Sequence, residues 1–294
     1  MIKNFIQKKW ESPESLRNLY SANKPYPHIV MENFINHNKL QGVHEEFPDL
    51  SKLPIDLINN FNSKLENKFS SKGVFALSKN AFELISFLNS EFFLRYLQIL
   101  TGIEDTLMSD PYLVGGGYHE IKRDGFLKIH ADFNKHPNID FKRRLNLLIY
   151  LNKNWQESWG GDFQMYDKKM EGPMKRVFPT YNTCVIFTTT SLSYHGHPDP
   201  LMCPRNQSRK SLALYYFSGT KPNTTLPNVH GTIFKNRPED AKAMIAEKDA
   251  LVAEKDALVA EKEALVDEKN NLLNSASWKI TSPLRKLKKI IKNK

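Results

Sequence analysis

Between residues 109 and 219 the sequence breaks into short apolar or alternating runs, each ended by Gly, Pro, Asn or Asp. The clearest of these runs read GFLKIHADF, LNLLIYLN, GGDFQMYD, NTCVIFTTTS and KSLALYYFS. Many short strands separated by turn residues at this spacing are typical of a β-sandwich or barrel. We therefore predict a β-structure for this part of the chain.

The first 108 or so residues show a different pattern. One short extended segment, YPHIVMENF, is followed by helical patterns such as NAFELISFLNSEFFLRYLQIL, in which apolar residues recur at spacings of three and four. We expect this region to be mostly helical. Together with the strands that follow, it places the chain in the α+β class.

A seven-residue repeat occupies residues 246–273 and reads AEKDALV, AEKDALV, AEKEALV and DEKNNLL. Ala, Glu, Lys and Leu are good helix formers, so we predict a helix over 237–274. The repeat places leucine at d and lysine at a, as Leu251, Leu258, Leu265 and Leu272 and as Lys248, Lys255, Lys262 and Lys269. Lysine at every a position weakens a coiled-coil seam, although glutamates at g could pair with it. Two interpretations stay open, a solvated helical spacer and a weak homodimer through 246–273.

The last segment, 275–294, is basic and amphipathic. Leu284, Leu287 and Ile291 share one face of a helix that begins near Pro283, and basic residues cover the other faces. Such a helix can lie on an anionic membrane surface. A solubilising tail, or one that docks on a partner protein, is the alternative.

Composition limits the partners and the compartment. The formal net charge is +10, but seven of the basic residues lie within the last twenty, which contain no acid. The rest of the chain is nearly balanced, so we expect no nucleic-acid partner. We expect a cytoplasmic protein, because the chain has two cysteines, no secretory signal and no membrane-length apolar stretch. It could also contact the inner face of the membrane peripherally.

A polar pair, His130 and Asp132, interrupts the apolar run FLKIHADF. Side chains two residues apart on a strand project from the same face. About sixty residues further on comes SYHGHPDP, which holds His195 and His197. Two His and one carboxylate on neighbouring strands can bind one face of an octahedral metal, as in non-haem Fe(II) oxygenases, and leave positions open for an oxo acid and dioxygen.

A 2-oxo acid with a second carboxylate also needs a cation. Arg209 follows the second His motif on a strand and can meet a carboxylate through two hydrogen bonds. Ser211, two residues on, shares the same strand face and could donate another hydrogen bond.

These pieces resemble, in order, the Fe(II)- and 2-oxoglutarate-dependent dioxygenases of the prolyl 4-hydroxylase type, and bacterial members in particular. The matching stretches are HAD, RRLNLLIYLN, GGDFQMYD, VFPTYNTCVIF, SYHGHPDP and RKS, with PYPHIVMENF and GGGYHEI before them. The resemblance implies a double-stranded β-helix, or jelly roll, with flanking N-terminal helices. It gives a dioxygenase domain over 1–236, with its jelly-roll core at about 109–219, ahead of the helix over 237–274 and the tail over 275–294.

Residue by residue, the resemblance assigns His130, Asp132 and His195 to the metal. Arg209 matches the anchor of the distal carboxylate of 2-oxoglutarate, Tyr150 a position that helps to hold it, and Ser211 the partner of the arginine. His197 competes with His195 as third ligand. We prefer His195 because His-Gly-x-Pro resembles the bacterial members and because Pro198 restricts the backbone of His197. His197 then lies near the metal ligands or toward substrate, and His119 could also face the pocket.

The implied activity is hydroxylation of a protein side chain of the prolyl type. It would use Fe(II), 2-oxoglutarate and dioxygen, with ascorbate as a candidate reductant, and would release succinate and carbon dioxide. The tail SWKITSPLRKL resembles the ends of enzymes of bacterial surface-polysaccharide assembly, so a surface glycan or its precursor is an alternative substrate. A jelly-roll scaffold without catalysis, acting through its tail on a membrane or partner, is the second alternative.

Overall fold

The structure is a computed structural model that describes residues 2–219 and 228–285. Contacts divide the chain into two compact units, Met1–Arg237 and Pro238–Lys294. The first unit contains the β-structure and the N-terminal helices, and the second contains the C-terminal helices. We describe each unit by itself.

Most of the first unit is antiparallel β-structure. Its strands are β1 (His28–Glu32), β2 (Ile58–Asn62), β3 (Glu66–Ser71), β4 (Leu107–Ser109), β5 (Gly117–Lys122), β6 (Phe126–Ala131), β7 (Phe141–Tyr150), β8 (Phe163–Tyr166), β9 (Lys175–Val177), β10 (Thr183–Thr188), β11 (Tyr194–His197), β12 (Ser208–Gly219) and β13 (Ile233–Phe234). Its α-helices are α1 (Pro13–Ala22), α2 (His37–Glu45), α3 (Lys79–Leu88) and α4 (Glu91–Thr101).

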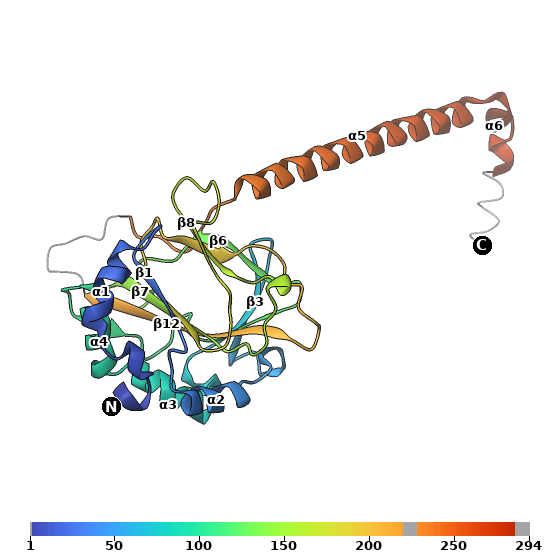
Figure 1. Cartoon of the computed structure of the whole chain (residues 1–294). Helices are drawn as coiled ribbons and strands as arrows, with labels where there is room; N and C mark the ends of the chain where they lie inside the picture. Colours follow the sequence, from blue (N-terminus) through green and yellow to red (C-terminus); the bar gives the residue numbers. More distant parts are fainter. Residues whose placement is uncertain (1, 220–227, 286–294) are drawn as a thin grey trace. The chain divides into compact units, whose positions relative to one another are not determined.

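Most strands follow one path, β1-β10-β7-β12-β5-β3-β6-β11-β8-β9, while β2, β4 and β13 pair off it with β3, β12 and β6. The sheet curls into a nearly closed barrel (Figure 1). The predicted jelly roll with N-terminal helices is thereby confirmed. The consecutive strands β5 and β6 do not pair with each other. Strand β3 lies between them, paired through Phe69 and Ser70 to β5 and through Glu66 and Asn67 to β6. A strand from the N-terminal region therefore closes this side of the barrel.

Strand β7 shows why a central strand of this barrel reads as an almost continuous apolar run. Leu145, Leu147 and Ile149 belong to the core shared with the helices, whereas Tyr150 belongs to a second cluster with strands β8 and β10. Asn146 and Leu148, on the same strand face as Tyr150, line a pocket inside the barrel. Both faces are buried, one by helices and one by the barrel interior, so few positions can be polar.

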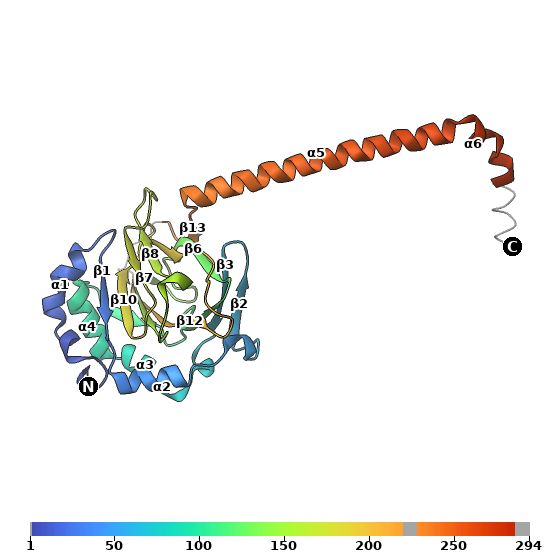
Figure 2. The same cartoon turned by 45° about the vertical axis from the view of Figure 1, so that its right-hand side comes forward.

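Helices α1–α4 lie on the outside of the barrel, on the side of β1 and β7 (Figures 1 and 2). Helix α3 begins at Ser78, whose hydroxyl accepts a hydrogen bond from Ala81 N at 3.4 Å, and α4 ends at Gly102, which has a φ of 71°. Both ends follow the usual chemistry of helix caps. The buried faces of the two helices, including Leu84 and Leu97, join the core against β7 and β12.

The hairpin formed by β2 and β3 was not predicted from the sequence. Its residues, INNFN and ENKFSS, are rich in Asn, which is depleted in strands, and most of them are only partly buried. The hairpin forms because β3 pairs with two barrel strands that are far away in sequence. Pairing with strands far away in sequence therefore outweighs the low strand propensity of these residues.

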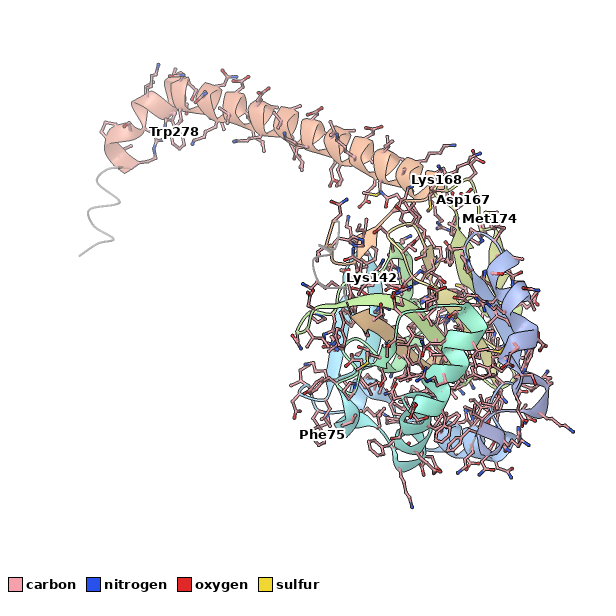
Figure 3. The ribbon with its side chains drawn as sticks, turned by 90° about the vertical axis from the view of Figure 1, so that its left-hand side faces the viewer. Phe75, Lys142, Asp167, Lys168, Met174 and Trp278 are labelled. Carbon is pink, nitrogen blue, oxygen red and sulfur yellow. The ribbon has the colours of Figure 1, made fainter. Side chains whose placement is uncertain are left out.

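The second unit contains α5 (Pro238–Asn274) and α6 (Ala276–Ile280), which carries Trp278 (Figure 3). No residue of α5 is buried. Within the described ranges, none of the helices combines the length and apolar character that a membrane span requires. The predicted amphipathic helix of 275–294 extends outside the described residues, which end at Arg285.

Candidate active site

Three predicted metal ligands meet at one end of the barrel interior. His130 is on β6, Asp132 lies just beyond that strand, and His195 is on β11, directly opposite His130 in the strand register. Their candidate ligand atoms all lie within 4.8 Å of one another. His130 Nε2 is 3.6 Å from Asp132 Oδ1, and His195 Nε2 is 3.4 Å from Asp132 Oδ2. The structure thus brings together the pair in FLKIHADF and a histidine more than sixty residues away.

The two histidines are oriented in the same way. His130 Nδ1 is 2.9 Å from the carbonyl oxygen of Lys128, and His195 Nδ1 is 2.9 Å from that of Ser193. A carbonyl only accepts, so each Nδ1 carries a proton, and in the neutral ring Nε2 then has the lone pair that a metal can bind. The two Nε2 atoms lie close to the Asp132 carboxylate. Burial, and then the neighbouring His195, lower the pKa of His130, which favours the neutral form that binds a metal.

Asp132 is held by two residues of β7. Asn146 Nδ2 donates to Asp132 Oδ2 at 2.7 Å, and Arg143 Nη2 lies 3.2 Å from the same oxygen. Burial alone would raise the pKa of Asp132, but the Arg143 guanidinium and the His195 ring hold it well below its usual range. Two imidazoles and one carboxylate form the donor set of the facial triad, so these residues fit an Fe(II) ion.

Arg209, on β12, lines the same pocket. Its Nε donates to Gly161 O at 2.7 Å and its Nη2 to the Tyr150 hydroxyl at 3.3 Å. Among the described carboxylates none forms an ion pair with Arg209. Asp162 is close enough to raise the pKa of Arg209 electrostatically, but its carboxylate accepts hydrogen bonds from Arg176 Nε and Nη2 at 2.6 and 3.0 Å. A buried guanidinium without a counter-charge is costly, so this pocket is built to receive an anion.

Tyr150 and Ser211 flank Arg209. Burial raises the pKa of Tyr150 to about 12, partly offset by Arg209, so its hydroxyl keeps its proton. Ser211 is buried, lines the pocket and lies opposite both Tyr150 and His119 in the strand register. The hydroxyls of both residues can therefore serve a carboxylate bound at Arg209.

His119 and His197 also line the pocket. His119 Nε2 is 2.9 Å from Gly115 O, and burial together with Lys68 lowers its pKa. His197 is outside the group of three candidate ligands and has no hydrogen-bond partner on either ring nitrogen. Burial, and then Arg209, lower the pKa of His197 well below its usual value.

Three residues of the site were not predicted. Asn146 and Arg143 lie within RRLNLLIYLN, where Asn146 is a polar residue in a buried strand on the same face as Tyr150, which was a usable signal. Lys68 lines the pocket from β3 and pairs with Glu66 at 3.0 Å. No sequence signal pointed to Lys68, because the hairpin that carries it was not predicted.

The fold and the His130–Asp132–His195 cluster of this pocket are similar to those of non-haem iron oxygenases of the jelly-roll class. Residues 116–217 match the family model of the 2OG-Fe(II) oxygenase superfamily. Those residues belong to that superfamily, and the chain is an oxidoreductase of the dioxygenase class. Membership implies Fe(II), 2-oxoglutarate and dioxygen as its cofactor and co-substrates.

Solved prolyl hydroxylases have a similar fold. A prolyl hydroxylase from Trichoplax adhaerens, in complex with a hypoxia inducible factor oxygen degradation domain peptide fragment, is 18% identical, with a TM-score of 0.51 over 72% of this chain and 94% of that one. A prolyl-4-hydroxylase from Pseudomonas putida is 13% identical, with a TM-score of 0.48 over 71% of this chain and 99% of that one. No curated protein matches the chain in sequence. The chain is similar in fold to the Trichoplax adhaerens prolyl hydroxylase.

Proposed function

We propose that this chain hydroxylates a protein side chain of the prolyl type, with iron held by His130, Asp132 and His195. The observation that carries the proposal is one pocket that combines this donor set with the guanidinium of Arg209, which forms no ion pair with any described carboxylate. The Trichoplax adhaerens enzyme, solved with a peptide, supports a protein substrate. When bound, the iron and its co-substrates supply oxidising power: 2-oxoglutarate becomes succinate and carbon dioxide, and one oxygen atom of dioxygen enters a substrate C–H bond.

The protein's own part is to bind and to orient. The Nε2 atoms of His130 and His195 and the Asp132 carboxylate would hold the metal, because the Nδ1 contacts fix the direction of both rings. Arg209 and Tyr150 would hold the distal carboxylate of 2-oxoglutarate, with Ser211 beside them. Arg209 is fixed through Gly161 O, so it is already in position before the co-substrate binds.

A direct test measures succinate release by the purified protein with Fe(II), 2-oxoglutarate and dioxygen. Turnover should require the metal, and ascorbate should sustain it if it reduces the iron. The Asp132→Ala variant should abolish metal-dependent turnover, whereas Arg209→Gln should mainly raise the concentration of 2-oxoglutarate required. A wild-type protein without turnover, whose melting temperature is unchanged by Fe(II) and 2-oxoglutarate, would contradict the proposal.

The substrate is tested by comparing turnover with proline-containing peptides and with sugar nucleotides. Peptide-stimulated succinate release with a matching mass gain of one oxygen supports the protein substrate. Stimulation by sugar nucleotides alone would replace it by a glycan precursor.

A further inference from the structure

His197 stands out in the pocket because its polar atoms are unused. Its side chain is 3% exposed, and neither ring nitrogen has a hydrogen-bond partner. By contrast, Nδ1 of both His130 and His195 lies at hydrogen-bond distance from a carbonyl oxygen. Buried polar atoms are nearly always paired, and leaving them unpaired is unfavourable. This imidazole is therefore suited to a ligand that enters the pocket.

The strand register shows which end of the pocket His197 faces. It is two residues beyond His195 on β11, so both rings project from the same strand face. His195 lies opposite His130, whereas His197 lies opposite Leu127, toward the start of β6, with a shift of register between the two pairs. His197 is thus displaced along the barrel from the metal ligands by about two residues of strand, roughly 7 Å.

This displacement is toward Arg209. Gly196 pairs with Gln164 on β8, and the strands are antiparallel, so His197 lies toward the start of β8. Just before that start is Gly161, whose carbonyl oxygen accepts the hydrogen bond from Arg209 Nε. His197 and Arg209 line the same pocket. The imidazole therefore faces the end of the pocket that receives an anion.

We propose that His197 is a further co-substrate-binding residue, whose ring N–H donates a hydrogen bond to the distal carboxylate of the 2-oxo acid beside the Arg209 guanidinium. A neutral imidazole has one N–H donor and a carboxylate has only acceptors, so the contact satisfies both groups. It also makes the site select for a 2-oxo acid with a second carboxylate, because an apolar end would leave the imidazole unpaired. The inference rests on the proposed role of Arg209 in holding that carboxylate.

The test measures ligand binding rather than turnover. Protein loaded with Mn(II), which accepts similar ligands without oxygen chemistry, is titrated in a calorimeter with 2-oxoglutarate and with 2-oxopentanoate, which has the same chain length but ends in a methyl group. In His197→Leu the affinity for 2-oxoglutarate should fall about tenfold or more, the change expected for one hydrogen bond to a charged group. The affinity for 2-oxopentanoate should stay within about twofold, because that ligand lacks the acceptor.

Two further variants complete the experiment. His197→Gln keeps a donor at nearly the same position and should retain most of the affinity for 2-oxoglutarate, and Arg209→Gln should lose more than His197→Leu. Metal-free His197→Leu should melt no lower than the wild type, because it removes a buried polar ring without a partner.

The possible results separate this inference from the proposed function. If His197→Leu binds 2-oxoglutarate as the wild type does, or loses affinity for both ligands equally, His197 does not contact the distal carboxylate and the inference fails alone. If the wild type binds neither ligand, the proposed function fails and this inference fails with it.

Discussion

Asp132 is the residue whose surroundings most affect the proposed metal site. Its Oδ2 contacts Asn146 and Arg143, and Asn146 Oδ1 in turn accepts hydrogen bonds from Arg143 Nε and Nη2 at 2.9 and 2.6 Å. The guanidinium lies 3.6 Å from the centroid of the Tyr215 ring and 4.4 Å from that of Phe133. This closed set of contacts fixes the direction of the carboxylate.

We expect Asn146→Leu to weaken metal binding. The change keeps a similar volume but removes the hydrogen bond to Asp132 Oδ2, and loss of a partner behind a metal ligand typically costs about 10- to 100-fold in affinity. Calorimetric titration with Mn(II) measures the loss. Asn60→Leu, at an exposed position of β2, is the matched control and should bind as the wild type does. Equal affinity in the two variants would show that Asn146 does not orient the ligand.

At the scale of elements, strand β6 is supported on both edges. It pairs with β11 along one edge and with β3 along the other, and the short strand β13 joins at its end, with Phe234 opposite His130. The rings of His130 and Phe234 are 5.6 Å apart. Two segments outside the matched family region, one N-terminal and one C-terminal, therefore support the strand that carries two candidate ligands.

Helix α5 is confirmed as a helix, but its pairing remains a prediction. The apolar positions of each heptad are consecutive, as in Ala250, Leu251, Val252 and Ala253, and consecutive residues point around the whole helix. The exposed leucines and valines repeat every seven residues as one narrow stripe, and lysine occupies the neighbouring a positions. This arrangement favours a solvated spacer over a strong dimer.

The assignment of leucine to d and lysine to a can be tested by making the a positions apolar. If Leu251 and its repeats lie at d, Lys255→Leu together with Lys262→Leu converts two a positions to apolar residues and should shift the full chain toward dimer by about tenfold or more. Sedimentation equilibrium measures this shift. Asp249→Leu with Asp256→Leu adds the same number of leucines at b positions and should leave the chain monomeric. Equal association of both double variants would mean that the seam is assigned wrongly.

At the scale of the whole molecule, buried histidines make stability depend on pH. Burial lowers the pKa of His28, whose Nδ1 is 2.8 Å from Tyr26 O, and it also lowers the pKa of His44. As the pH falls below about 6.5, these groups protonate in the unfolded chain before they do so in the folded one. The unfolded state then binds more protons, so stability decreases with falling pH.

We expect the free energy of unfolding of the metal-free protein to fall between pH 7.5 and pH 5.5, by up to about 1.4 kcal/mol per pH unit for each such histidine. Urea denaturation across this range measures the slope. His28→Gln should make the slope shallower, because one group no longer titrates. A variant whose curve runs parallel to that of the wild type would contradict the assignment.

We also propose, from the tail sequence, peripheral contact with anionic membranes through 275–294. The described part supplies exposed Trp278, Ile280 and Leu284 beside Lys279, and the Arg285 guanidinium lies 3.6 Å from the centroid of the Trp278 ring. Deleting 275–294 should abolish co-sedimentation with vesicles of anionic lipid, and neutral vesicles are the control. Binding that survives the deletion would exclude the tail as the membrane contact.

The sequence by itself determined the β-structure over about 109–219, the pair of ligands two residues apart and the helical repeat, because these depend on local spacing and on the alternation of buried and exposed positions. Only the tertiary structure decided which strands and side chains lie next to one another. It brought His195 rather than His197 to the pair, directed His197 toward Arg209, inserted β3 between β5 and β6, and placed Asn146 behind Asp132. These outcomes depend on strand register and on pairing between distant segments, where a shift of one residue would turn every side chain to the other face.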